Sequence, residues 1–438
     1  MAKPKIQSVK GTRDFYPEQM LVRNWLYANM RAAAQAFGYQ EYDGPFIESL
    51  ELYAAKSGDE LVKEQAFVFQ DRGGEMVTLR PELTPSLARM IAARQALLPR
   101  PIRWWSFGPF WRYERPQKGR TREFFQWNID LLGADNPQAD AEIAAVGAGF
   151  FRAVGLSTDQ IRIKVNNRRL MEDQLGRLGI PMEQKTAAFR VIDRRGKLSQ
   201  ADWVAYAAGQ GMEAQQLAGL EWVLGDPDLW RSSSELAQFF DALEALGASD
   251  YVEYDPAVVR GLDYYTGNVF EAVEATGEGR SIFGGGRYDN LVGDVGGEPL
   301  SGVGFALGDV MISVVLEKFG LVPPFRPAPA QVLVTVFDES LLRSALSLSR
   351  ELRDEGLKVE WYPGPARLPK QLKYADSLGI PYAAIEGPDE TARGEVTLKD
   401  LSKRRQVTVP RPEAARTLRS WLQSSEERPR AGSEPAGG

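Results

Sequence analysis

The chain has 438 residues, 43% of them hydrophobic and 26% charged, which is the composition of a globular protein with two or three domains. It has neither cysteine nor histidine, which excludes disulfides, thiolate or imidazole metal sites and catalysis by a histidine base. With a formal net charge of −6 it has no overall basic field, so a polyanionic partner must be met by local clusters of cations.

The sequence pattern of the first half of the chain predicts helices that alternate with paired strands. Apolar side chains at helical spacing predict helices over residues 19–38, 85–98 and 137–155. Alternating apolar residues around short turns predict hairpins at residues 64–82 and 103–133 and a single strand at 160–167. Residues 168–249 are predicted to be mostly helical and to form an insertion.

The second half begins with strand-like residues and then changes character. We predict strands within residues 251–274, a glycine-rich turn at 283–292, and a strand that leads into a helix at 301–320. The proline-rich segment at 321–330 indicates a domain boundary. After it, strands and helices alternate as βαβαβ, which predicts a small α/β domain with a parallel sheet, followed by two more strands and a last helix.

These elements predict two domains. The core domain would occupy residues 1–325, with the insertion at about 168–249, and the α/β domain would occupy residues 326–424. Residues 425–438 are polar and are predicted to be a disordered tail. The sequence has no apolar run that could cross a bilayer and no apolar segment near its N-terminus, so we expect a cytoplasmic protein without a membrane partner.

The hairpin predicted at residues 103–133 carries a cluster of cations. Four arginines and one lysine, with one glutamate, lie in the eleven residues from Arg112 to Arg122. Arg112 and Arg122 would lie on opposite arms, with the other cations at the tip. Because arginine offers planar, bidentate donors to phosphate, the cluster suggests a phosphate site. On charge alone, a solvated hairpin whose cations keep a sheet edge soluble is the simpler interpretation.

Further candidate site residues lie on the second arm of this hairpin and in other segments of the chain. Gln126 and Asp130 would face the same side of a strand as Arg122 and could line the floor of a site, although polar residues at period two also mark the wet face of a sheet. Other candidates are Arg80, Glu82 and Thr84 in "TLRPELTP", Arg260, Asp263 and the pair Tyr264 and Tyr265 in "VVRGLDYYTGNVFE", and the three glycines of "FGGGRYDN".

Five segments occur together in a recognisable order: "KGTRDFYP", "LRPELTPS", "FWRYERPQKGRTREFFQ", "VRGLDYYTGNVFE" and "GGGRYDNLV". Together they resemble the histidyl-tRNA synthetase family, which belongs to the class II aminoacyl-tRNA synthetases. The resemblance covers about residues 8–320, and the unit after the proline-rich segment resembles the family's anticodon-binding domain. It implies an α+β fold, with an antiparallel-sheet catalytic core, a helical insertion and a C-terminal α/β domain. It also implies a homodimer with "FGYQEYDGPFIES" at the interface.

The activity implied by this resemblance is the ATP-dependent attachment of L-histidine to tRNA(His) through histidyl-adenylate, with ATP and Mg²⁺ but no metal site of the protein's own. The residues implied to bind histidine are Glu82, Thr84, Gln126, Asp130, Tyr264 and Tyr265. Asp130, Tyr264 and Tyr265 would surround the imidazole. Glu82, Thr84 and Gln126 would hold the α-ammonium. The residues implied to bind ATP are Arg112, Arg122 and Arg260, with Arg112 and Arg260 catalytic. Those implied to meet the acceptor end of the tRNA are Arg115, Gln117 and Lys118.

This chemistry suits a chain without histidine. In the activation step a carboxylate attacks the α-phosphorus of ATP, and because the carboxylate is already ionised at neutral pH, no general base is needed. The step needs charge neutralisation and positioning, which arginines and Mg²⁺ supply. Imidazole held between a carboxylate and a hydroxyl is strongly selected, because an analogue that lacks either nitrogen leaves a buried polar group unpaired.

One segment departs from the family pattern. Class II motif 3 ordinarily ends in an arginine that contacts ATP, but Asp309, Val310 and Met311 stand where many family members have Leu-Glu-Arg. Either the chain belongs to a subgroup that dispenses with this arginine, or its ATP binding is altered. Arg287 is the candidate substitute.

Two other functions are compatible with parts of the sequence. A non-catalytic, synthetase-like regulatory subunit of ATP phosphoribosyltransferase in histidine biosynthesis shares the core fold, but it resembles the family less in the basic hairpin and lacks the C-terminal domain. This chain has both, which favours the enzyme. A nucleic-acid-binding module without catalysis would leave the candidate histidine-binding residues without a purpose. The sequence does not fix which tRNA bases are read, and a helix with Lys370, Gln371 and Lys373 is predicted to present a solvated face.

Overall fold

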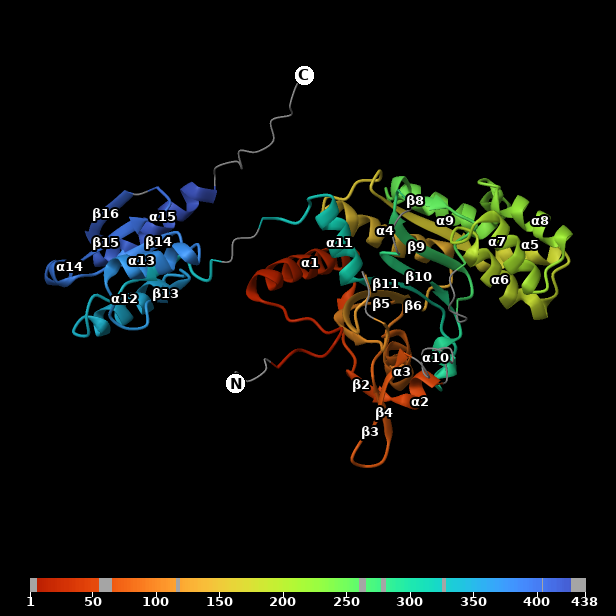
Figure 1. Ribbon diagram of the computed structural model, residues 1–438, viewed down its shortest axis with the longest axis horizontal. Coiled ribbons are helices and arrows are strands. Elements are labelled where there is room, and N and C mark those ends of the chain that lie inside the picture. Colours follow the sequence, from red (N-terminus) through yellow and green to blue (C-terminus); the bar gives the residue numbers. More distant parts are fainter. Residues whose placement is uncertain are drawn as a thin grey trace, which may run out of the picture. The chain divides into compact units, whose positions relative to one another are not determined.

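The structure is a computed structural model, and it describes residues 6–54, 65–115, 119–259, 265–276, 281–324, 328–403 and 405–426. The described residues form two compact units (Figure 1). The core unit consists of the residues up to Phe15 and of Val22–Pro323, and the C-terminal unit consists of Tyr16–Leu21 and the residues from Pro324 onward. Within these ranges, every helix is too short or too polar to reach across a lipid bilayer.

A large, mostly antiparallel sheet forms the centre of the core unit (Figure 1). Its strand order is β1-β5-β6-β11-β10-β9-β7-β8, with parallel pairing at β1–β5 and β7–β8. The strands are β1 (Gln40–Glu41), β5 (Ile102–Trp111), β6 (Glu123–Leu132), β7 (Ile161–Asn167), β8 (Val252–Tyr254), β9 (Asn268–Glu274), β10 (Phe283–Tyr288) and β11 (Gly302–Gly308). The hairpin predicted at residues 103–133 is confirmed as β5 and β6, which pair along their whole length.

Helices cover one face of this sheet. They are α1 (Pro17–Ala36), α4 (Pro137–Ala153), α9 (Ser234–Ala245) and α11 (Asp309–Lys318), all of which bury apolar side chains in one core. On β6, Trp127 is fully buried in this core, and its ring lies 5.2 Å from the ring of Phe150 on α4. Since side chains alternate along a strand, Gln126 and Asp130 point to the opposite face. The helices predicted over 19–38 and 137–155 are thereby confirmed, and α4 begins at the sequence signal of an Asn136 cap followed by proline.

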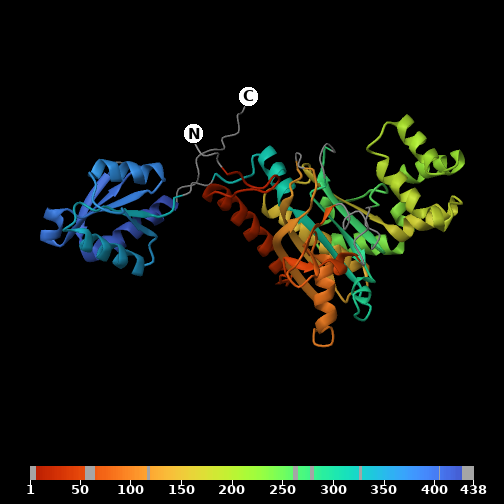
Figure 2. The same cartoon turned by 60° about the horizontal axis from the view of Figure 1, so that its bottom comes forward.

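Residues 168–249 are mostly helical, as predicted. The segment contains α5 (Arg168–Arg177), α6 (Lys185–Arg194), α7 (Gln200–Gly209) and α8 (Ala214–Leu224), with short 3₁₀ turns, before α9. Figures 1 and 2 show α5–α8, in yellow and yellow-green, as a group to one side of the large sheet. These helices have a buried centre, where the indole of Trp203 is fully buried and its Nε1 donates to the carbonyl of Val191 at 2.7 Å. The last helix of the segment, α9, packs against α4 and so belongs to the main core.

A smaller sheet with the order β2-β4-β3 lies at the start of the core unit. It consists of β2 (Ile47–Ser49), β3 (Phe67–Gln70) and β4 (Met76–Leu79), and it is accompanied by α2 (Leu50–Ala54), α3 (Thr84–Arg94) and α10 (Leu291–Asp294). The hairpin predicted at 64–82 is therefore confirmed, as is the helix predicted over 85–98, which begins with a proline in its first turn. Large apolar side chains on and beside this sheet are 37% to 51% exposed, namely Phe46, Ile47, Val68, Phe69 and Met76.

The glycine-rich segment is a strand, so the prediction of a turn at residues 283–292 is wrong. Its three glycines lie inside β10, which pairs with β9 and β11. A Cβ atom at Gly285 would lie 2.0 Å from the carbonyl oxygen of Gly304, and one at Gly286 would lie 2.7 Å from the carbonyl oxygen of Asn268. Close approach of neighbouring strand backbones therefore requires these glycines, and no chain reversal is involved.

The C-terminal unit is the predicted βαβαβ arrangement with an antiparallel extension. Its sheet has the order β13-β12-β14-β15-β16, and β12 is parallel to both of its neighbours. The elements are β12 (Val332–Val334), α12 (Leu342–Asp354), β13 (Val359–Trp361), α13 (Leu368–Ser377), β14 (Tyr382–Ile385), α14 (Pro388–Arg393), β15 (Glu395–Asp400), β16 (Arg405–Pro410) and α15 (Ala414–Glu426). Helix α15 continues into the predicted tail, and the rest of that tail lies outside the described residues.

On α13, the prediction of a solvated face holds for the lysines and is wrong for Gln371. Lys370 and Lys373 are exposed, whereas Gln371 is 1% exposed. Its Oε1 accepts from the backbone N–H of Val336 at 2.9 Å, and its Nε2 donates to the carbonyl of the same residue at 2.7 Å. Gln371 thus holds the chain in place just after β12, where backbone groups would otherwise be buried without partners.

Candidate active site

The face of the large sheet opposite the helices has a floor with few side chains. On β6, Gln126 and Asp130 point to this face, and their partners on β11 are Gly308 and Gly304. On β5 the partner of Gln126 is Gly108. A side chain at Gly304 would collide with Asp130, because its Cβ would lie 2.4 Å from Oδ1. The glycines therefore leave room for a ligand above the polar residues of β6.

A cleft of about 730 Å³ lies over part of this floor. This volume is in the range that holds small-molecule ligands. Its walls include Phe124 and Gln126 of β6, Arg112 from the end of β5, and Val310 and Met311 of α11. The cleft therefore brings together the basic hairpin, the middle of β6 and the start of α11, which are distant in the sequence.

Arg112 connects the hairpin to the segment after β4. Its backbone N–H donates to the carbonyl of Arg122 at 2.9 Å, and its side-chain Nε donates to the carbonyl of Pro81 at 3.0 Å. The guanidinium also lies over the ring of Phe124, with Cζ 5.4 Å from the ring centroid. These contacts fix an arginine in the wall of the cleft, beside the residue that precedes Glu82.

The other cations of the hairpin have different surroundings. Arg122 lies over the ring of Tyr113 at 4.0 Å and donates from Nε to the carbonyl of Glu114 at 3.3 Å, so its guanidinium is engaged within the hairpin. Arg120 forms an ion pair with the Glu114 carboxylate at 3.0 Å, and Arg115 is exposed. Gln117 and Lys118 lie outside the described residues.

Asp130 is a buried carboxyl group close to two tyrosines, Tyr288 and Tyr42. It is 5% exposed, and its Oδ1 accepts a hydrogen bond from the hydroxyl of Tyr288 at 2.7 Å. Burial raises the pKa of Asp130 to about 7, although the hydrogen bond from Tyr288 opposes the shift. Burial, and next the charge of Asp130, raise the pKa of Tyr42, whose ring is close to that of Trp104 on β5.

Tyr265 lies on the same face as Asp130. A Cβ atom at Gly286 would lie 2.8 Å from Cδ1 of Tyr265, so the ring of this tyrosine covers Gly286 on β10. Gly286 pairs with Gly304, and Gly304 pairs with Asp130. Two strand spacings, or about 10 Å, therefore separate the row under Tyr265 from Asp130, a gap of the size of a small aromatic ring and its hydrogen bonds. Tyr264 and Arg260 lie outside the described residues.

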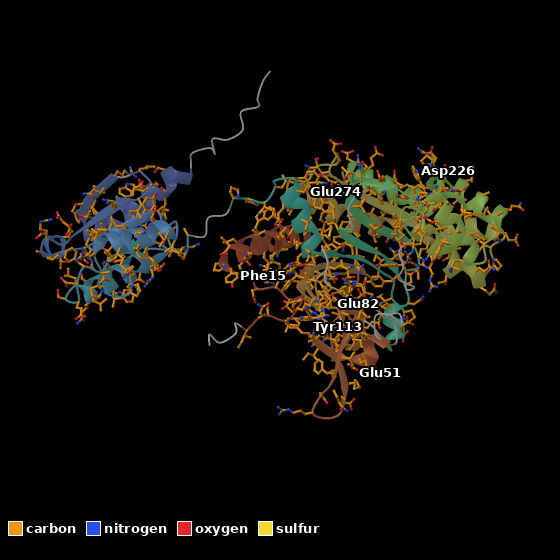
Figure 3. All side chains as sticks on the ribbon, viewed as in Figure 1. Phe15, Glu51, Glu82, Tyr113, Asp226 and Glu274 are labelled. Carbon is orange, nitrogen blue, oxygen red and sulfur yellow. The ribbon has the colours of Figure 1, made fainter. Side chains whose placement is uncertain are left out.

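Glu82 and Thr84 lie at the corner between β4 and α3. Glu82 is 8% exposed, and its backbone carbonyl accepts from the hydroxyl of Tyr53 at 3.1 Å. Thr84 is the first residue of α3. The end of β5 meets the chain just after β4, because the N–H of Trp111 donates to the carbonyl of Arg80 at 3.1 Å. Figure 3 labels Glu82 and Tyr113, the residues close to this contact in the sequence. The structure thus places Glu82 next to the Arg112 wall of the cleft, through the Arg112–Pro81 contact.

Arg80, which precedes this corner, has a supporting role, because its side chain is buried and does not line the cleft. It is fully buried, its Nη1 pairs with Asp43 at 2.6 Å, and its Nε donates to the carbonyl of Pro109 at 3.0 Å. Arg80 therefore ties the segment before β2 to β5, and it supports the floor near Gly108, where a Cβ atom would lie 2.3 Å from Nη2.

Arg287 does not replace the missing arginine of motif 3, and that prediction is wrong. It lies on β10 one residue after Gly286, so it points to the face that the helices cover. It is 3% exposed, and its Nη2 pairs with the Asp140 carboxylate at 2.5 Å. Burial raises the pKa of Asp140 to about 6, while Arg287 opposes the shift. The place of the family arginine is occupied in the cleft wall by the thioether side chain of Met311.

The cleft carries charges of both signs. Its cations include Arg112, Arg120, Lys164 and Lys197, and its acids include Glu114, Asp193, Asp255 and Glu271. Lys164 pairs with Asp255 at 2.8 Å, and Lys197 pairs with Asp193 at 2.8 Å. In the described part of the chain, acidic side chains do not gather in threes as a metal cage of their own would require.

Sequence reasoning missed two contacts of the site. Tyr288 lies in the quoted "GGGRYDNLV" segment, but its bond to Asp130 joins residues 158 positions apart, which the pattern cannot show. Arg13 in "KGTRDFYP" pairs with Asp309, which is buried, at 2.8 Å. Both tyrosine and arginine were visible in the motifs, but their partners follow only from the sheet topology.

Comparison with known proteins gives a consistent result over nearly the whole chain. The profile of the family described as "Histidyl-tRNA synthetase" matches residues 11–310, and that of the family described as "Anticodon binding domain" matches residues 331–421. A curated protein named "Histidine--tRNA ligase" from Leptospira biflexa is 36% identical over 428 residues, which are 95% of this chain and 98% of that protein.

Two further relatives come from other organisms. A "Histidine--tRNA ligase" from Haloarcula marismortui is 36% identical over 418 residues, which are 92% of this chain and 95% of that protein. The crystal structure of histidyl-tRNA synthetase from Nostoc sp. PCC 7120 superposes with a TM-score of 0.81 at 26% identity, and the match covers 96% of this chain and 100% of that one. The family profile alone covers well over half of the chain. This chain therefore belongs to the histidyl-tRNA synthetase family.

Proposed function

We propose that this protein attaches L-histidine to tRNA(His), using ATP and passing through histidyl-adenylate. The observation that carries the proposal is the combination on one sheet face of a cleft lined by Arg112 and Gln126 with the buried carboxyl group of Asp130. The first two residues suit a phosphate and an ammonium or carboxylate group, and the third suits the N–H of an imidazole. The glycine floor lets a small amino acid and a nucleotide lie directly against the strands.

In the first step, the histidine carboxylate attacks the α-phosphorus of ATP, the bond to the β-phosphate oxygen breaks, and pyrophosphate leaves. No proton has to be removed from the nucleophile. Arg112 would bind the α-phosphate and stabilise the charge that develops there, with Arg122 and Arg260 as further ATP-binding residues and Arg260 as the second catalytic arginine. Acidic side chains of the cleft, such as Glu114 and Glu271, would help to hold the Mg²⁺ that accompanies ATP, and the ion would supply positive charge for the pyrophosphate leaving group.

Histidine would lie along the floor from Gln126 to Asp130. Its α-ammonium would meet Glu82, Thr84 and Gln126, at the end of the floor next to Arg112. Its imidazole would lie between Asp130 and Tyr265, with Tyr264 lining the same pocket. This orientation places the substrate carboxylate toward Arg112 and therefore toward the α-phosphate of ATP.

In the second step, a ribose hydroxyl at the end of the tRNA attacks the acyl carbon of histidyl-adenylate, and AMP leaves. The acceptor end would be contacted by residues near the tip of the hairpin, namely Arg115, Gln117 and Lys118. Two of these are cations, which suit the phosphates of the tRNA. The larger arrangement that we propose is a homodimer in the cytoplasm. The sheet β2-β4-β3 has exposed apolar side chains, and its strand β2 lies in the segment that the family resemblance puts at the interface, which supports this proposal.

The domain arrangement that we propose follows from the same assignment. Residues 1–325 would form the catalytic core, with the inserted helices at about 168–249, and residues 326–424 would bind the anticodon before a tail at 425–438. The match of residues 331–421 to an anticodon-binding profile supports the role of the C-terminal unit. The regulatory-subunit alternative is not favoured, since the chain carries both this unit and the basic hairpin.

Pyrophosphate exchange is the direct test of the proposed function. Purified protein with ATP, Mg²⁺ and radiolabelled pyrophosphate should incorporate label into ATP when histidine is added. It should not do so with any other standard amino acid, because only imidazole satisfies both Asp130 and Tyr265. If histidine gave no exchange above the amino-acid-free blank, the regulatory subunit would be the better assignment.

Phe337 is a candidate contact for the unpaired bases of the tRNA. It follows β12, which has β13 on one side and β14 on the other. The strand order therefore reverses beside β12, and α/β sheets bind ligands at the carboxyl ends of the strands where such a reversal occurs. Its side chain is 51% exposed, whereas the preceding residue is fixed by Gln371. An exposed aromatic ring on a rigid backbone suits base stacking.

Replacement of Phe337 by alanine should raise the KM for tRNA(His) by about 10-fold, since stacking on one base contributes about 1–3 kcal/mol. Pyrophosphate exchange, which needs no tRNA, should be unchanged. Phe337→Tyr should keep the wild-type KM because it keeps the ring. Val407→Ala, which shortens a 38% exposed side chain on β16 of the same unit, is the matched control. An unchanged KM for Phe337→Ala would remove this residue from the tRNA contact.

A further inference from the structure

We propose that the segment from Gly11 to Phe15 is a strap that holds the two edges of the nucleotide cleft in register, and that the ion pair between Arg13 and Asp309 is its fastening. One edge is the base of the basic hairpin, and the other is the start of α11. Arg13 and Asp309 are in this view positioning residues for ATP. The inference rests on the proposed function, because it assigns ATP to this cleft.

The first end of the strap holds the hairpin through its backbone. The carbonyl oxygen of Gly11 accepts from the N–H of Arg122 at 2.8 Å and from the N–H of Glu123 at 3.1 Å. Gly11 has φ +87°, and a Cβ atom there would lie 2.8 Å from Cγ of Arg122. Only glycine therefore fits this close contact without strain. Because Arg122 in turn accepts from the N–H of Arg112 at 2.9 Å, the strap adjoins the arm that carries the phosphate-binding arginine.

The second end holds the start of α11 through the side chain of Asp309. Strand β11 ends at Gly308, which pairs with Gln126 on β6. The next N–H along β6, that of Phe125, has no strand partner on this side and donates instead to Oδ1 of Asp309 at 2.9 Å. Asp309 therefore continues the β6–β11 ladder by one hydrogen bond after the strand has turned into a helix.

Arg13 neutralises the carboxylate that makes this bond. Its Nη2 lies 2.8 Å from Oδ2 of Asp309, whose side chain is 9% exposed. Phe15, two residues later, packs edge-on against the ring of Phe125 at 5.8 Å between centroids. Loss of the ion pair would deprive Oδ2 of Asp309 of this donor, and the ladder bond that Oδ1 makes would be held less firmly.

The geometry couples this ion pair to the cleft. Asp309 is the first residue of α11, and the two residues after it, Val310 and Met311, line the cleft. Loss of the fastening would shift these side chains away from Arg112 on the other edge. Since the chain lacks the motif 3 arginine at Met311, we infer that fixed spacing of the walls compensates for the missing charge in holding ATP.

Steady-state pyrophosphate exchange of Arg13→Ala tests the inference. The KM for ATP should rise by about 10- to 100-fold, because displacement of a positioning element by about 1 Å has effects of this size. The KM for histidine should rise much less than that for ATP, because only Gln126 among the proposed histidine-binding residues adjoins Phe125, and Asp130 lies farther along β6. Arg13→Lys should recover part of the loss, since it keeps the charge but not the planar fork.

A double-mutant cycle separates positioning from simple stability. Asp309→Asn keeps an oxygen for the Phe125 N–H and needs no cation, so the Arg13→Ala/Asp309→Asn variant should bind ATP better than Arg13→Ala alone. Arg31→Ala is the matched control, because it removes an exposed ion pair with Glu41 at 2.9 Å from the same N-terminal region and should change neither KM. Thermal melting with and without ATP reports binding without turnover and stays informative if histidine supports no exchange.

Two results would overturn the inference. The first is an Arg13→Ala variant that melts at a lower temperature but has an unchanged KM for ATP and an unchanged stabilisation by ATP, which would make the pair purely structural. The second is an equal rise of the KM values for ATP and histidine, which would indicate general loosening of the sheet. If Arg13→Ala does not fold, the same comparisons apply to Arg13→Lys and Asp309→Asn.

Discussion

Replacement of Arg112 by alanine is expected to slow histidine-dependent pyrophosphate exchange by about 10²- to 10³-fold, the usual effect of removing one fixed donor from a developing charge. The hydrogen bond from Nε to the Pro81 carbonyl and the contact with the Phe124 ring hold the guanidinium in the cleft wall before ATP arrives. The loss should appear mainly in kcat, because the charge on the α-phosphate grows in the transition state.

Two further variants show whether position or charge matters. Arg112→Lys keeps a cation but loses the Nε contact and the bidentate geometry, so it should recover only a minor part of the rate. Arg120→Ala removes another arginine of the same cleft, one that is 53% exposed and paired with Glu114, and should cost less than about 10-fold. Equal losses for Arg112→Ala and Arg120→Ala would contradict a specific role for Arg112.

Replacement of Asp130 by asparagine is expected to raise the KM for histidine by about 10²- to 10³-fold, the cost of losing a charged hydrogen bond in a buried site. The amide keeps the size of the side chain and an acceptor for Tyr288, but it offers no charge to the imidazole N–H. The KM for ATP should be nearly unchanged, since Asp130 lies beyond the cleft that Arg112 lines. Titration of histidine and of ATP separately in the exchange assay measures both values.

The same variant should become more stable than the wild type at alkaline pH. The pKa of Asp130 in the folded protein is about 7, above its ordinary value of 3.8, so folding favours the protonated acid. Its contribution to stability is therefore complete below about pH 4 and is lost as the pH rises through about 7. At pH 8 the wild type holds a buried charge that Asp130→Asn lacks, and the variant should melt at a higher temperature, by a margin that shrinks as the pH falls toward about 4.

Asp140→Asn is the control for this pH dependence. Asp140 is also buried, with a pKa of about 6, but it is paired with Arg287 at 2.5 Å on the helix-covered face. Loss of its charge would remove the nearest and most buried carboxylate that pairs with the Arg287 guanidinium, and the variant should be less stable at every pH. A wild type that was as stable as Asp130→Asn at pH 8 would contradict a raised pKa for the buried carboxyl group of Asp130.

Much of the fold could be predicted from the sequence because its signals are local. The β5–β6 hairpin has alternating apolar residues on both arms, α4 starts at an asparagine cap and a proline, and the C-terminal unit alternates strands and helices beyond a proline-rich segment. β10 was not predictable in this way, because three glycines are typical of turns. The close approach of the neighbouring strands, at Gly304 for Gly285 and at Asn268 for Gly286, explains two of them.

The candidate site was predictable as a set of residues but not as a geometry. Motifs identified Gln126 and Asp130, and the strand period placed them on one face. The pairing of Arg13 with Asp309 spans 296 positions, and no local pattern could reveal it. Arg287 was assigned to the site in error. As part of a turn its side chain could have any direction, but on β10 the alternation of side chains turns it to the face of the sheet that the helices cover.

Met311 in the cleft wall has a consequence for inhibitor selectivity. A compound whose acidic group depends on an arginine at this point in other synthetases should lose that contact here. A compound with an apolar or aromatic substituent at the same point would instead gain contact with a flexible, polarisable thioether. The substitution of one cation by methionine thus offers medicinal chemistry a way to distinguish this enzyme from relatives that retain the charge.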